Sequence, residues 1–585
     1  MNFQLRAPRI PHLSVVEQVL VNRGIAASEI QHYLNTTDKD ILPPDIIDNI
    51  ENGARMLISH IAKGSKVLLQ VDSDCDGFTS SATFMNYLNR IFPSFVQNNI
   101  IYRVHENKAH GIILDSVPED VELVIALDAS SNEFEIHKKL KEKGVDVLVI
   151  DHHNASHYSE NACVINNQLC GYPTKSLSGV GMVFKFCSFI DSLLKTNYAN
   201  DYLDLVALGI IADVMDLKDF ETRHLVNKGC LNIKNPFLKG MVIKQDYSLK
   251  GKVTPMGAAF YIVPGINATT RVGTIEEKMT LFESMLEFKA YEQIPSTKRG
   301  CKGQSETRVE QACRNCTNVR NRQTKMRDAS LEIIEKLIKE NNLLDNKVLA
   351  VRLEGSNESN RNITGLIANI LMSKYQRPVL VLNKTECFNE NTGETYITWD
   401  GSGRNAGGTE LNDFQLFLIQ SKLFEYAEGH SNAFGASIRD DKFEEFIEYS
   451  NQKLKDMDFT PNYKPDVIYF ANMIHGTEIL NLADLSHVWG QGVEEPLVAI
   501  TDIKIDKNNI GLFGSSTLKI SLPSTEGISL VKFKSSKEEY ENLYSDLGCV
   551  TINIVGRCSR NSGWDDKPQI IIEDYEIVGR TAYYF

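Results

Sequence analysis

The chain lacks any long hydrophobic run. No segment approaches about 18 consecutive apolar residues, the length that spans a bilayer, and residues 1–6 form no apolar core of a signal peptide. We therefore expect no membrane partner and a cytoplasmic location.

Cysteine is sparse and irregularly placed. The 11 cysteines show no regular spacing, which excludes a disulfide-rich secreted scaffold and favours reduced thiols. One cluster, Cys301, Cys313 and Cys316, contains a Cys-x-x-Cys spacing but has no fourth ligand nearby. Surface thiols are the expectation there, with a structural zinc site as the alternative.

The chain also lacks an excess of basic residues. It carries 62 lysines and arginines against 76 acidic residues, a net charge of −14. General attraction to a polyanion is therefore excluded, and nucleic-acid binding would need a local basic channel or bound metals. With 585 residues and 42% hydrophobic content, the composition is that of a globular protein of three or four domains.

The most informative segment runs from Leu68 to Gly77. An apolar strand ends there, and Asp72, Asp74 and Asp76 follow at alternating positions. Three carboxylates so close together repel one another unless a positive group lies among them, and a divalent cation is the simplest such group. A solvated turn is the alternative.

The surrounding pattern predicts a mostly parallel sheet covered by helices. Apolar, β-branched runs alternate with amphipathic segments, as in βαβ units. Strands are expected at residues 67–71, 121–127 and 145–150, and helices at 80–92, 180–194 and 202–214.

Potential metal ligands lie at the ends of four of these segments. They are the Asp72 triplet, Asp128, the run Asp151-His152-His153, and Asp213. Three of the four groups end strands, and the carboxyl ends of parallel strands meet at one edge of a sheet. Carboxylates with imidazole suit Mn²⁺ or Mg²⁺, and the absence of thiolates disfavours zinc. Two cations about 3.5–4 Å apart would activate water for a phosphoryl displacement.

Further domains are expected downstream. Residues 296–330 are polar and basic and lead into a helix ending near Asn342. A second α/β unit then has strands at 347–353 and 378–382 and a helix at 363–375, followed by a glycine-rich loop at 401–408. After Pro461 short strands recur, which predicts a small antiparallel barrel. These strands are expected at residues 498–505, 518–521, 528–533, 550–555 and 569–572.

The ordered motifs carry a family resemblance. They resemble the four motifs of the DHH phosphoesterase superfamily, and more closely the RecJ type of single-strand-specific exonuclease. The four are Asp74-Cys75-Asp76-Gly77, Asp128, Asp151-His152-His153 and Ala212-Asp213. Other segments similar to RecJ are Arg23-Gly24-Ile25, Ser178-Gly179-Val180-Gly181, Leu205-Val206-Ala207-Leu208-Gly209, Pro264-Gly265-Ile266-Asn267-Ala268 with Arg271, Gly401-Ser402-Gly403-Arg404 and Glu428-Gly429-His430.

The resemblance implies a metal site with either Mn²⁺ or Mg²⁺, two ions being expected. The implied ligands are Asp74, Asp76, Asp128, His152 and Asp213, with Asp128 as the bridge. Asp72 is less certain, because related phosphatases carry an amide there. The implied catalytic set is Asp128, Asp151, His152, His153 and His430. In that set His153 is a ligand or a proton-handling neighbour, and Asp151 orients an imidazole.

The resemblance also implies contacts to DNA. Ser402, Arg404 and His430 would bind phosphate across a cleft from the metals. Asn267 and Arg271 would contact the backbone, although either could simply stabilise a turn. For the 5′ end, Arg103, His105 and Lys108 are the open alternatives, with His105 in the expected set. On the C-terminal strands Lys532, Phe533, Lys534, Trp564 and Lys567 are plausible DNA contacts, but barrel packing explains such aromatics as well, so no site is assigned there.

The sequence departs from the RecJ pattern in three places. They are the segment 103–111, Glu428 in place of a glycine, and the segment 360–365. A carboxylate at position 428 is unfavourable beside phosphate unless it turns away. The departures indicate a divergent member of the family, with a viral origin as an open alternative. We expect it in the cytoplasm of a bacterial cell or of a virus-infected host cell.

The resemblance implies an α/β multidomain fold with five parts. They are an N-terminal helical segment packing on the catalytic domain (1–62), a DHH catalytic domain (63–295), a basic connector and linking helix (296–345), a DHH-associated substrate-binding domain (346–460), and an OB-fold-like β-barrel that binds nucleic acid (461–585).

The function implied is metal-dependent hydrolysis of single-stranded DNA from the 5′ end, releasing 5′-mononucleotides during recombination, repair or replication. A monomer is expected, with a single-strand-binding protein or a helicase as the expected protein partner. Two alternatives stay open: a phosphodiesterase of short oligonucleotides or cyclic dinucleotides, and a non-catalytic replication scaffold. The first is disfavoured because such enzymes lack the barrel, and the second because the ligand set is complete.

Overall fold

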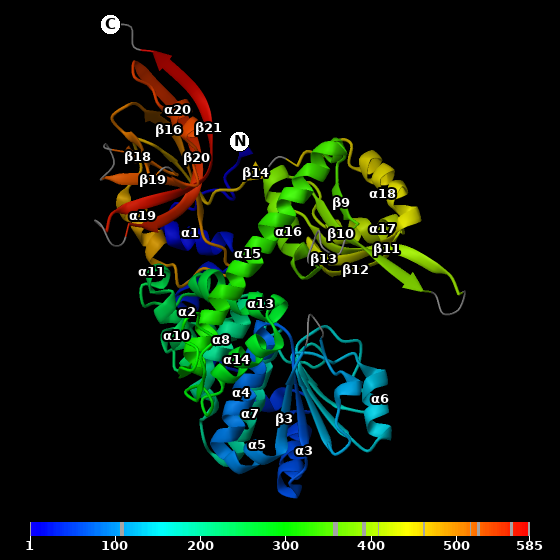
Figure 1. Cartoon of the computed structure of the whole chain (residues 1–585). Helices are drawn as coiled ribbons and strands as arrows, with labels where there is room; N and C mark the ends of the chain where they lie inside the picture. The colour runs from blue at the N-terminus through cyan, green and yellow to red at the C-terminus, as the bar shows by residue number, and fades with distance from the viewer. Residues whose placement is uncertain are drawn as a thin grey trace.

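The computed structural model describes residues 2–105, 110–354, 361–388, 393–406, 409–459, 462–514, 516–522, 527–561 and 566–582. Figure 1 shows a first lobe coloured blue to green, a second lobe in yellow-green, and a C-terminal unit in orange and red. The long helix α15 (Arg308–Glu340) runs from the first lobe to the second.

The first lobe is built on a five-stranded parallel sheet in the order β3-β2-β4-β5-β6. The strands are β2 (Val67–Val71), β3 (Ile100–Val104), β4 (Leu123–Leu127), β5 (Asp146–Asp151) and β6 (Cys163–Asn166). Successive side chains alternate between two cores, because strand residues point to opposite faces. Leu69 and Ile125 belong to one core, whereas Leu68 and Val124 belong to the core on the opposite face, under α6 (Phe134–Glu142).

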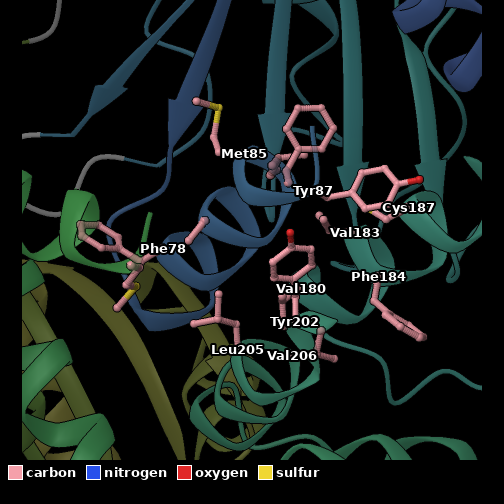
Figure 2. Close-up of a cluster of buried hydrophobic side chains, with 14 of the residues drawn as sticks. Phe78, Met85, Tyr87, Val180, Val183, Phe184, Cys187, Tyr202, Leu205 and Val206 are labelled. Carbon is pink, nitrogen blue, oxygen red and sulfur yellow. The ribbon is translucent and has the colours of Figure 1, made fainter. Parts of the chain in front are cut away.

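Three helices share one core with the face of this sheet that carries Leu69 and Ile125. They are α4 (Cys75–Ile91), α7 (Gly179–Leu194) and α8 (Leu203–Ala212). Figure 2 shows Phe78, Val180 and Leu205 among the buried side chains that join them. Burying side chains of this size stabilises the fold by roughly 1.5–3 kcal/mol each, which holds the first turns of α4 and α7 in place.

Further helices complete the first lobe. They are α3 (Ile50–Lys63), α5 (Pro93–Asn99), α9 (Phe220–Leu231), α10 (Pro236–Lys244), α11 (Asp246–Leu249), α12 (Pro255–Gly257), a π-helical turn (Ala258–Ile262), α13 (Val263–Val272) and α14 (Ile275–Met285). A short hairpin of β7 (Gln293–Pro295) and β8 (Ser305–Thr307) precedes α15.

The second lobe contains a mixed sheet in the order β12-β13-β11-β10-β9. Its strands are β9 (Leu349–Leu353), β10 (Val379–Phe388), β11 (Thr395–Arg404), β12 (Phe424–His430) and β13 (Ala433–Arg439). One face packs against α15 and α16 (Thr364–Tyr375). The other face packs against α17 (Phe414–Ser421) and α18 (Asp440–Lys453).

The C-terminal unit is a seven-stranded sheet, in the order β15-β16-β20-β21-β19-β18-β17. Two of its pairs, β15 with β16 and β19 with β21, are parallel. The elements are β14 (Asn462–Tyr463), β15 (Val467–Phe470), α19 (Gly476–Asp484), β16 (Leu497–Ile505), β17 (Ile510–Phe513), β18 (Thr517–Leu522), β19 (Ile528–Phe533), α20 (Lys537–Leu543), β20 (Gly548–Arg560) and β21 (Pro568–Ala582).

The strand-rich character predicted after Pro461 is confirmed, but the closed barrel is not found. In the described part of the chain, β15 and β17 each have one neighbouring strand, so the sheet is open. Strand spacing along the chain predicts turns, whereas closure depends on pairing between distant strands.

The N-terminal helical segment divides between two bodies. Side chains of α1 (Val15–Asn22) and α2 (Ile30–Leu34) belong to the core of the C-terminal unit, and β1 (Asn2–Phe3) pairs with β14. By contrast, α3 packs in the first lobe. Buried Arg23 fixes the first arrangement, since its two terminal nitrogens lie 2.7 Å from the two carboxylate oxygens of Asp466.

No helix in the described ranges is long and apolar enough to cross a membrane. The cysteine expectation is wrong in part: Cys313 and Cys316 are buried on α15 rather than exposed. Among the described residues, the groups able to hold a metal ion contain only aspartate and histidine.

Candidate metal centre

Aspartates from neighbouring elements converge at the carboxyl edge of the first sheet. Asp72 follows β2, Asp128 follows β4 and Asp151 ends β5, while Asp213 follows α8. Three overlapping groups bring ligand atoms within 4.8 Å of one another. They are Asp128, Asp151, His152 and His153; Asp76, His152 and Asp213; and Asp72, Asp74 and Asp128.

The predicted helix at 80–92 begins earlier than expected, and the reason lies in the aspartate triplet. Asp74 is the N-cap residue of α4 and accepts a hydrogen bond from the backbone N–H of Gly77 (2.9 Å). The cap starts the helix at Cys75, so Asp76 lies in its first turn with its side chain buried.

Asp76 joins the first turns of two helices. Its carboxylate accepts hydrogen bonds from Ser178 Oγ (3.1 Å) and from the backbone N–H groups of Gly179 (2.6 Å) and Val180 (3.2 Å) at the start of α7. Helix N-termini favour negative charge. Burial, followed by the charge of Asp74, nevertheless raises the pKa of Asp76 to about 7.

His152 lies between two further carboxylates. Its Nε2 is 3.2 Å from Asp128 Oδ1 and 3.3 Å from Asp213 Oδ2. Burial lowers the pKa of His152 to about 4, so the ring is neutral at pH 7. Burial and neighbouring aspartates raise the pKa of Asp213 to about 8 and raise that of Asp128 well above its ordinary value.

These atoms fit a bound cation. Asp128 Oδ1, His152 Nε2 and Asp213 Oδ2 are buried and have no hydrogen-bond partner among the described residues. Leaving buried acceptors unsatisfied costs about 1–3 kcal/mol each, and the carboxylates also repel one another. A divalent cation with oxygen and nitrogen ligands would satisfy both demands.

Close packing of glycines leaves no room for other side chains at this site. A Cβ atom at Gly179 would lie 2.4 Å from Asp128 Oδ1, and one at Gly209 would lie 2.2 Å from Asp76 Oδ1. Asp128 itself adopts a left-handed backbone conformation with φ of 64°. Such strain clusters at functional sites, where surrounding contacts enforce it.

Asp151 holds His153 rather than His152. Asp151 Oδ1 lies 2.8 Å from His153 Nδ1 and accepts the backbone N–H groups of His152 and His153, while Oδ2 accepts that of Ser131. The hydrogen bond to Asp151 raises the pKa of His153 to about 9. These bonds and the histidines hold the pKa of Asp151 well below its ordinary value, against the opposing effect of burial.

Sequence reasoning missed His110, which contacts Asp72. The His110 Nδ1 atom lies 2.7 Å from Asp72 Oδ2, and the Gly111 N–H donates to Asp72 Oδ1 (3.2 Å). His110 lies 38 residues from Asp72, within the segment 103–111 that departs from the RecJ pattern, and no local spacing links the two. His105, by contrast, is buried, with a side chain 1% exposed.

In the second lobe, the expectation of a glycine-rich loop at residues 401–408 is wrong in part. Residues 401–404 belong to β11. Ala433 of β13 pairs with both Arg404 and His430, so these two side chains share a face, roughly 10 Å apart across two strand spacings. The same register, through Gly435, places Ser402 and Glu428 on that face, so Glu428 does not turn away.

The two lobes meet at Arg271. The Asn362 side-chain amide donates to the backbone carbonyl of Arg271 (3.1 Å). Arg271 also lies close enough to Asp74 and to Arg404 to lower the pKa of both, although burial is the largest influence in each case and raises the pKa of Asp74. Arg271 thus lies within electrostatic range of Asp74 in the first lobe and of Arg404 in the second.

Of the other expected residues, Asn267 lies on α13 one turn before Arg271, and its Oδ1 has no hydrogen-bond partner in the described part of the chain. Lys532 forms an ion pair with Glu539 (2.9 Å). Lys108 and Trp564 lie outside the described residues.

Comparisons with known proteins show the family to which this chain is similar. The model of the DHH family, N-terminal domain, matches residues 66–210. YorK, a protein of the SPbeta prophage of Bacillus subtilis (strain 168) named as a single-strand DNA-specific exonuclease, is 36% identical over 99% of this chain and 98% of its own. The single-stranded-DNA-specific exonuclease RecJ of Haemophilus influenzae is 25% identical over 96% of each chain.

Solved structures show the same fold. The crystal structure of RecJ from Thermus thermophilus in complex with Mn²⁺ has a TM-score of 0.69 at 16% identity, covering 98% of this chain and 78% of that one. The corresponding Mg²⁺ complex has a TM-score of 0.63 at 15% identity and covers 98% of this chain and 77% of that one.

Proposed function

Because the chain belongs to the RecJ family of single-strand DNA-specific exonucleases, within the DHH superfamily, we propose that it hydrolyses phosphodiester bonds of single-stranded DNA. We propose hydrolysis from the 5′ end with release of 5′-mononucleotides, in recombination, repair or replication. The observation that supports this most strongly is the convergence of buried ligand atoms from Asp76, Asp128, His152 and Asp213.

The metal would be Mn²⁺ or Mg²⁺, with two ions expected. Asp74, Asp76, Asp128, His152 and Asp213 would hold them, and Asp72 is not counted among these ligands because His110 and Gly111 already engage its carboxylate. When bound, such ions polarise a phosphodiester and lower the pKa of a water molecule. Asp128 and His152 each lie in two of the three ligand groups, and of the two only the carboxylate has a second oxygen with which to bridge two ions, which supports that role for Asp128.

The chain's own residues would bind the phosphate. Arg404 can offer its guanidinium fork to phosphate oxygens, and Arg271 adds a second positive charge from the first lobe. Ser402, whose hydroxyl lies 2.9 Å from Thr364 Oγ1, would position the strand beside Arg404. His430, exposed at the end of β12, would contact the scissile phosphate.

Asp151 and His153 would together supply the proton that the leaving oxygen needs. Asp151 holds the Nδ1 side of the His153 ring, which leaves Nε2 for the substrate. A proton donated from Nε2 to the 3′ oxygen would favour its departure. Asp151 therefore acts by orientation, without contact to DNA.

Single-strand specificity would come from the space between the two lobes, which we propose is too narrow for a duplex. We propose that residues 63–295 form the catalytic domain, that the basic connector 296–345 joins it to the substrate-binding domain 346–460, and that residues 461–585 guide the strand as an OB-fold does. A monomeric, cytoplasmic enzyme working with a single-strand-binding protein or a helicase completes the proposal.

One experiment separates this function from its alternatives. Labelled single-stranded DNA, duplex DNA and a cyclic dinucleotide would be incubated with Mn²⁺ and either wild type or Asp128→Ala. We expect cleavage of the single strand alone, lost in the variant. Cleavage of the cyclic dinucleotide alone would contradict the exonuclease function. If no substrate is cleaved in the presence of Mn²⁺, the non-catalytic scaffold would be favoured.

A further inference from the structure

A continuous helical segment, residues 255–272, connects the C-terminal unit to the carboxylate cluster. It consists of α12, the π-helical turn and α13. At its start, Met256 packs against the core of the C-terminal unit, and Pro255 lies beside Gly490. At its end, Arg271 acts on Asp74. Figure 1 shows α13 beside α15, where the lobes approach each other.

This segment has one accessible face. Phe260, Pro264, Asn267 and Arg271 are spaced by four, three and four residues, which places them on one side of a helix. All four are at least partly exposed, whereas residues 262, 263, 265, 266 and 268–270 are buried. The accessible face therefore leads from Phe260 towards the carboxylates.

The π-helical turn adds a second aromatic ring to this face. A π-turn widens the helix and is frequent at functional sites. Here it exposes two adjacent rings, Phe260 at 59% and Tyr261 at 39%. Exposing two large rings side by side costs apolar burial, and no partner for either ring is found among the described residues.

The groups along the face match the chemistry of an unpaired strand. Arg271 offers a cation for a phosphate, and Asn267, whose Oδ1 atom is buried and has no hydrogen-bond partner in the described ranges, lies between Arg271 and the exposed rings. Phe260 lies roughly 16 Å from Arg271, because 11 residues of helix separate them at the usual rise per residue. Only an unpaired base can present its full face to such a ring, and stacking tolerates every sequence.

We propose that Phe260, with Tyr261 beside it, stacks against a base of the single strand downstream of the bond being cut. The proposal rests on the proposed exonuclease function and adds a strand-holding station between the C-terminal unit and the metal centre. The ring would hold the strand in register while nucleotides are removed, and would favour unpaired DNA.

The first test compares two substrates. A linear dinucleotide, which unlike a cyclic one has a 5′ end, is too short when bound at the carboxylates to cover roughly 16 Å, since about five nucleotides are needed at the rise of a stacked strand. Phe260→Ala is expected to lower kcat/KM on a 20-nucleotide strand about tenfold while leaving the dinucleotide unchanged. Phe260→Trp should keep most of the activity. Tyr247→Ala, which removes a ring 95% exposed on α11, is the matched control and should change neither rate.

The proposal would be overturned if Phe260→Ala hydrolysed both substrates at the wild-type rates, or if its kcat/KM fell by the same factor on both. Binding without hydrolysis gives an independent test: in EDTA, a 20-nucleotide strand with 2-aminopurine at successive positions should be quenched at one downstream position by wild type and not by Phe260→Ala. If wild type hydrolyses neither substrate, the proposed exonuclease function fails, and the fluorescence measurement alone decides whether Phe260 stacks on a base. Unchanged quenching in Phe260→Ala would contradict the stacking proposal.

Discussion

At the scale of single residues, the metal centre is a place where buried charge works against folding. Asp76, Asp128 and Asp213 have raised pKa values because burial and mutual repulsion disfavour their charged forms. The fold tolerates them because Asp76 caps α7 and because Asp128 occupies a left-handed conformation enforced by its neighbours. A bound cation would relieve the repulsion among these carboxylates, so metal binding would stabilise the folded protein.

Asp128→Asn is expected to separate stability from activity. The amide keeps the size of the side chain and tolerates the positive φ, but it removes a buried charge. The metal-free variant should therefore melt at the wild-type temperature or above it, while kcat/KM falls by at least about 100-fold. Thermal melting with and without Mn²⁺, alongside hydrolysis of labelled single-stranded DNA, measures both.

The matched control is Asp204→Asn, another buried carboxylate, which accepts the backbone N–H groups of Lys234 and Asn235 (2.7 and 2.6 Å). It should lose about 1–3 kcal/mol of stability and keep its response to Mn²⁺. Loss of the Mn²⁺ response in the control and its survival in Asp128→Asn would contradict the assignment.

The response to Mn²⁺ should depend on pH in a stated direction. Because the pKa values of Asp76 and Asp213 rise to about 7 and 8 in the folded state, the folded protein holds protons that the unfolded chain has already lost. Metal-free stability from these groups is therefore present at low pH and is lost as pH rises through these values. A cation requires the deprotonated ligands. The rise in Tm on adding Mn²⁺ should be larger at pH 8 than at pH 6, and an equal rise would contradict this ligand set.

At the scale of elements, the site depends on where a helix begins. The start of α7 supplies two N–H groups to Asp76 and a glycine with no Cβ against Asp128. Gly179→Ala should therefore displace Asp128 and lower kcat/KM by about 100-fold, with a loss of stability of about 1–3 kcal/mol from overpacking. Gly171→Ala is the control, since a Cβ there meets nothing within 4 Å. Steady-state kinetics and thermal melting test the pair, and wild-type kinetics in Gly179→Ala would show the contact to be unimportant.

The register of the second sheet predicts a separate effect on binding. Arg404→Ala should raise KM for single-stranded DNA about tenfold, because a charge-assisted hydrogen bond is worth about 1.5–3 kcal/mol. The Mn²⁺ shift in Tm should stay unchanged, since Arg404 lies in the opposite lobe. Arg439→Ala, at the other end of the same sheet, should alter neither quantity. An Arg404→Ala protein with a lost Mn²⁺ shift would show that Arg404 supports the metal centre instead.

Local patterns predicted much of the first lobe. Hydrophobic runs ending in aspartate marked β2, β4 and β5, because a buried parallel strand is apolar throughout and its carboxyl end is free to carry ligands. Features that depend on distant contacts were not predictable. Asp72 meets His110 across 38 residues, and residues 401–404 form a strand because β10 and β13 pair with them on both sides.

At the scale of the whole molecule, the first and last parts of the chain form one body. Helices α1 and α2 complete the core of the C-terminal unit, across more than 440 residues between Arg23 and Asp466. The expectation from the sequence placed the N-terminal helical segment on the catalytic domain instead, because amphipathic faces do not say what they pack against. The open sheet found in place of a barrel has the same origin in long-range strand pairing.

Arg23→Ala is expected to loosen this body. Removing Arg23 leaves Asp466, whose side chain is 0% exposed, without its bidentate partner. Breaking a buried pair in this way costs about 3–5 kcal/mol. Arg55→Ala, which removes an exposed pair with Glu51 (2.5 Å), should cost less than about 1 kcal/mol. Denaturant unfolding measures both, and equal values would contradict the role of Arg23.

The central claim is that the cluster of Asp76, Asp128, His152 and Asp213 holds the metal that makes this chain a single-strand DNA exonuclease. Its most direct test is the hydrolysis of labelled single-stranded DNA by EDTA-treated protein during titration with Mn²⁺, with bound Mn²⁺ measured in the same samples. We predict no hydrolysis before titration, recovery in step with bound metal, and loss of both in Asp128→Asn. Hydrolysis by the metal-free protein, or full metal binding by Asp128→Asn, would contradict the account.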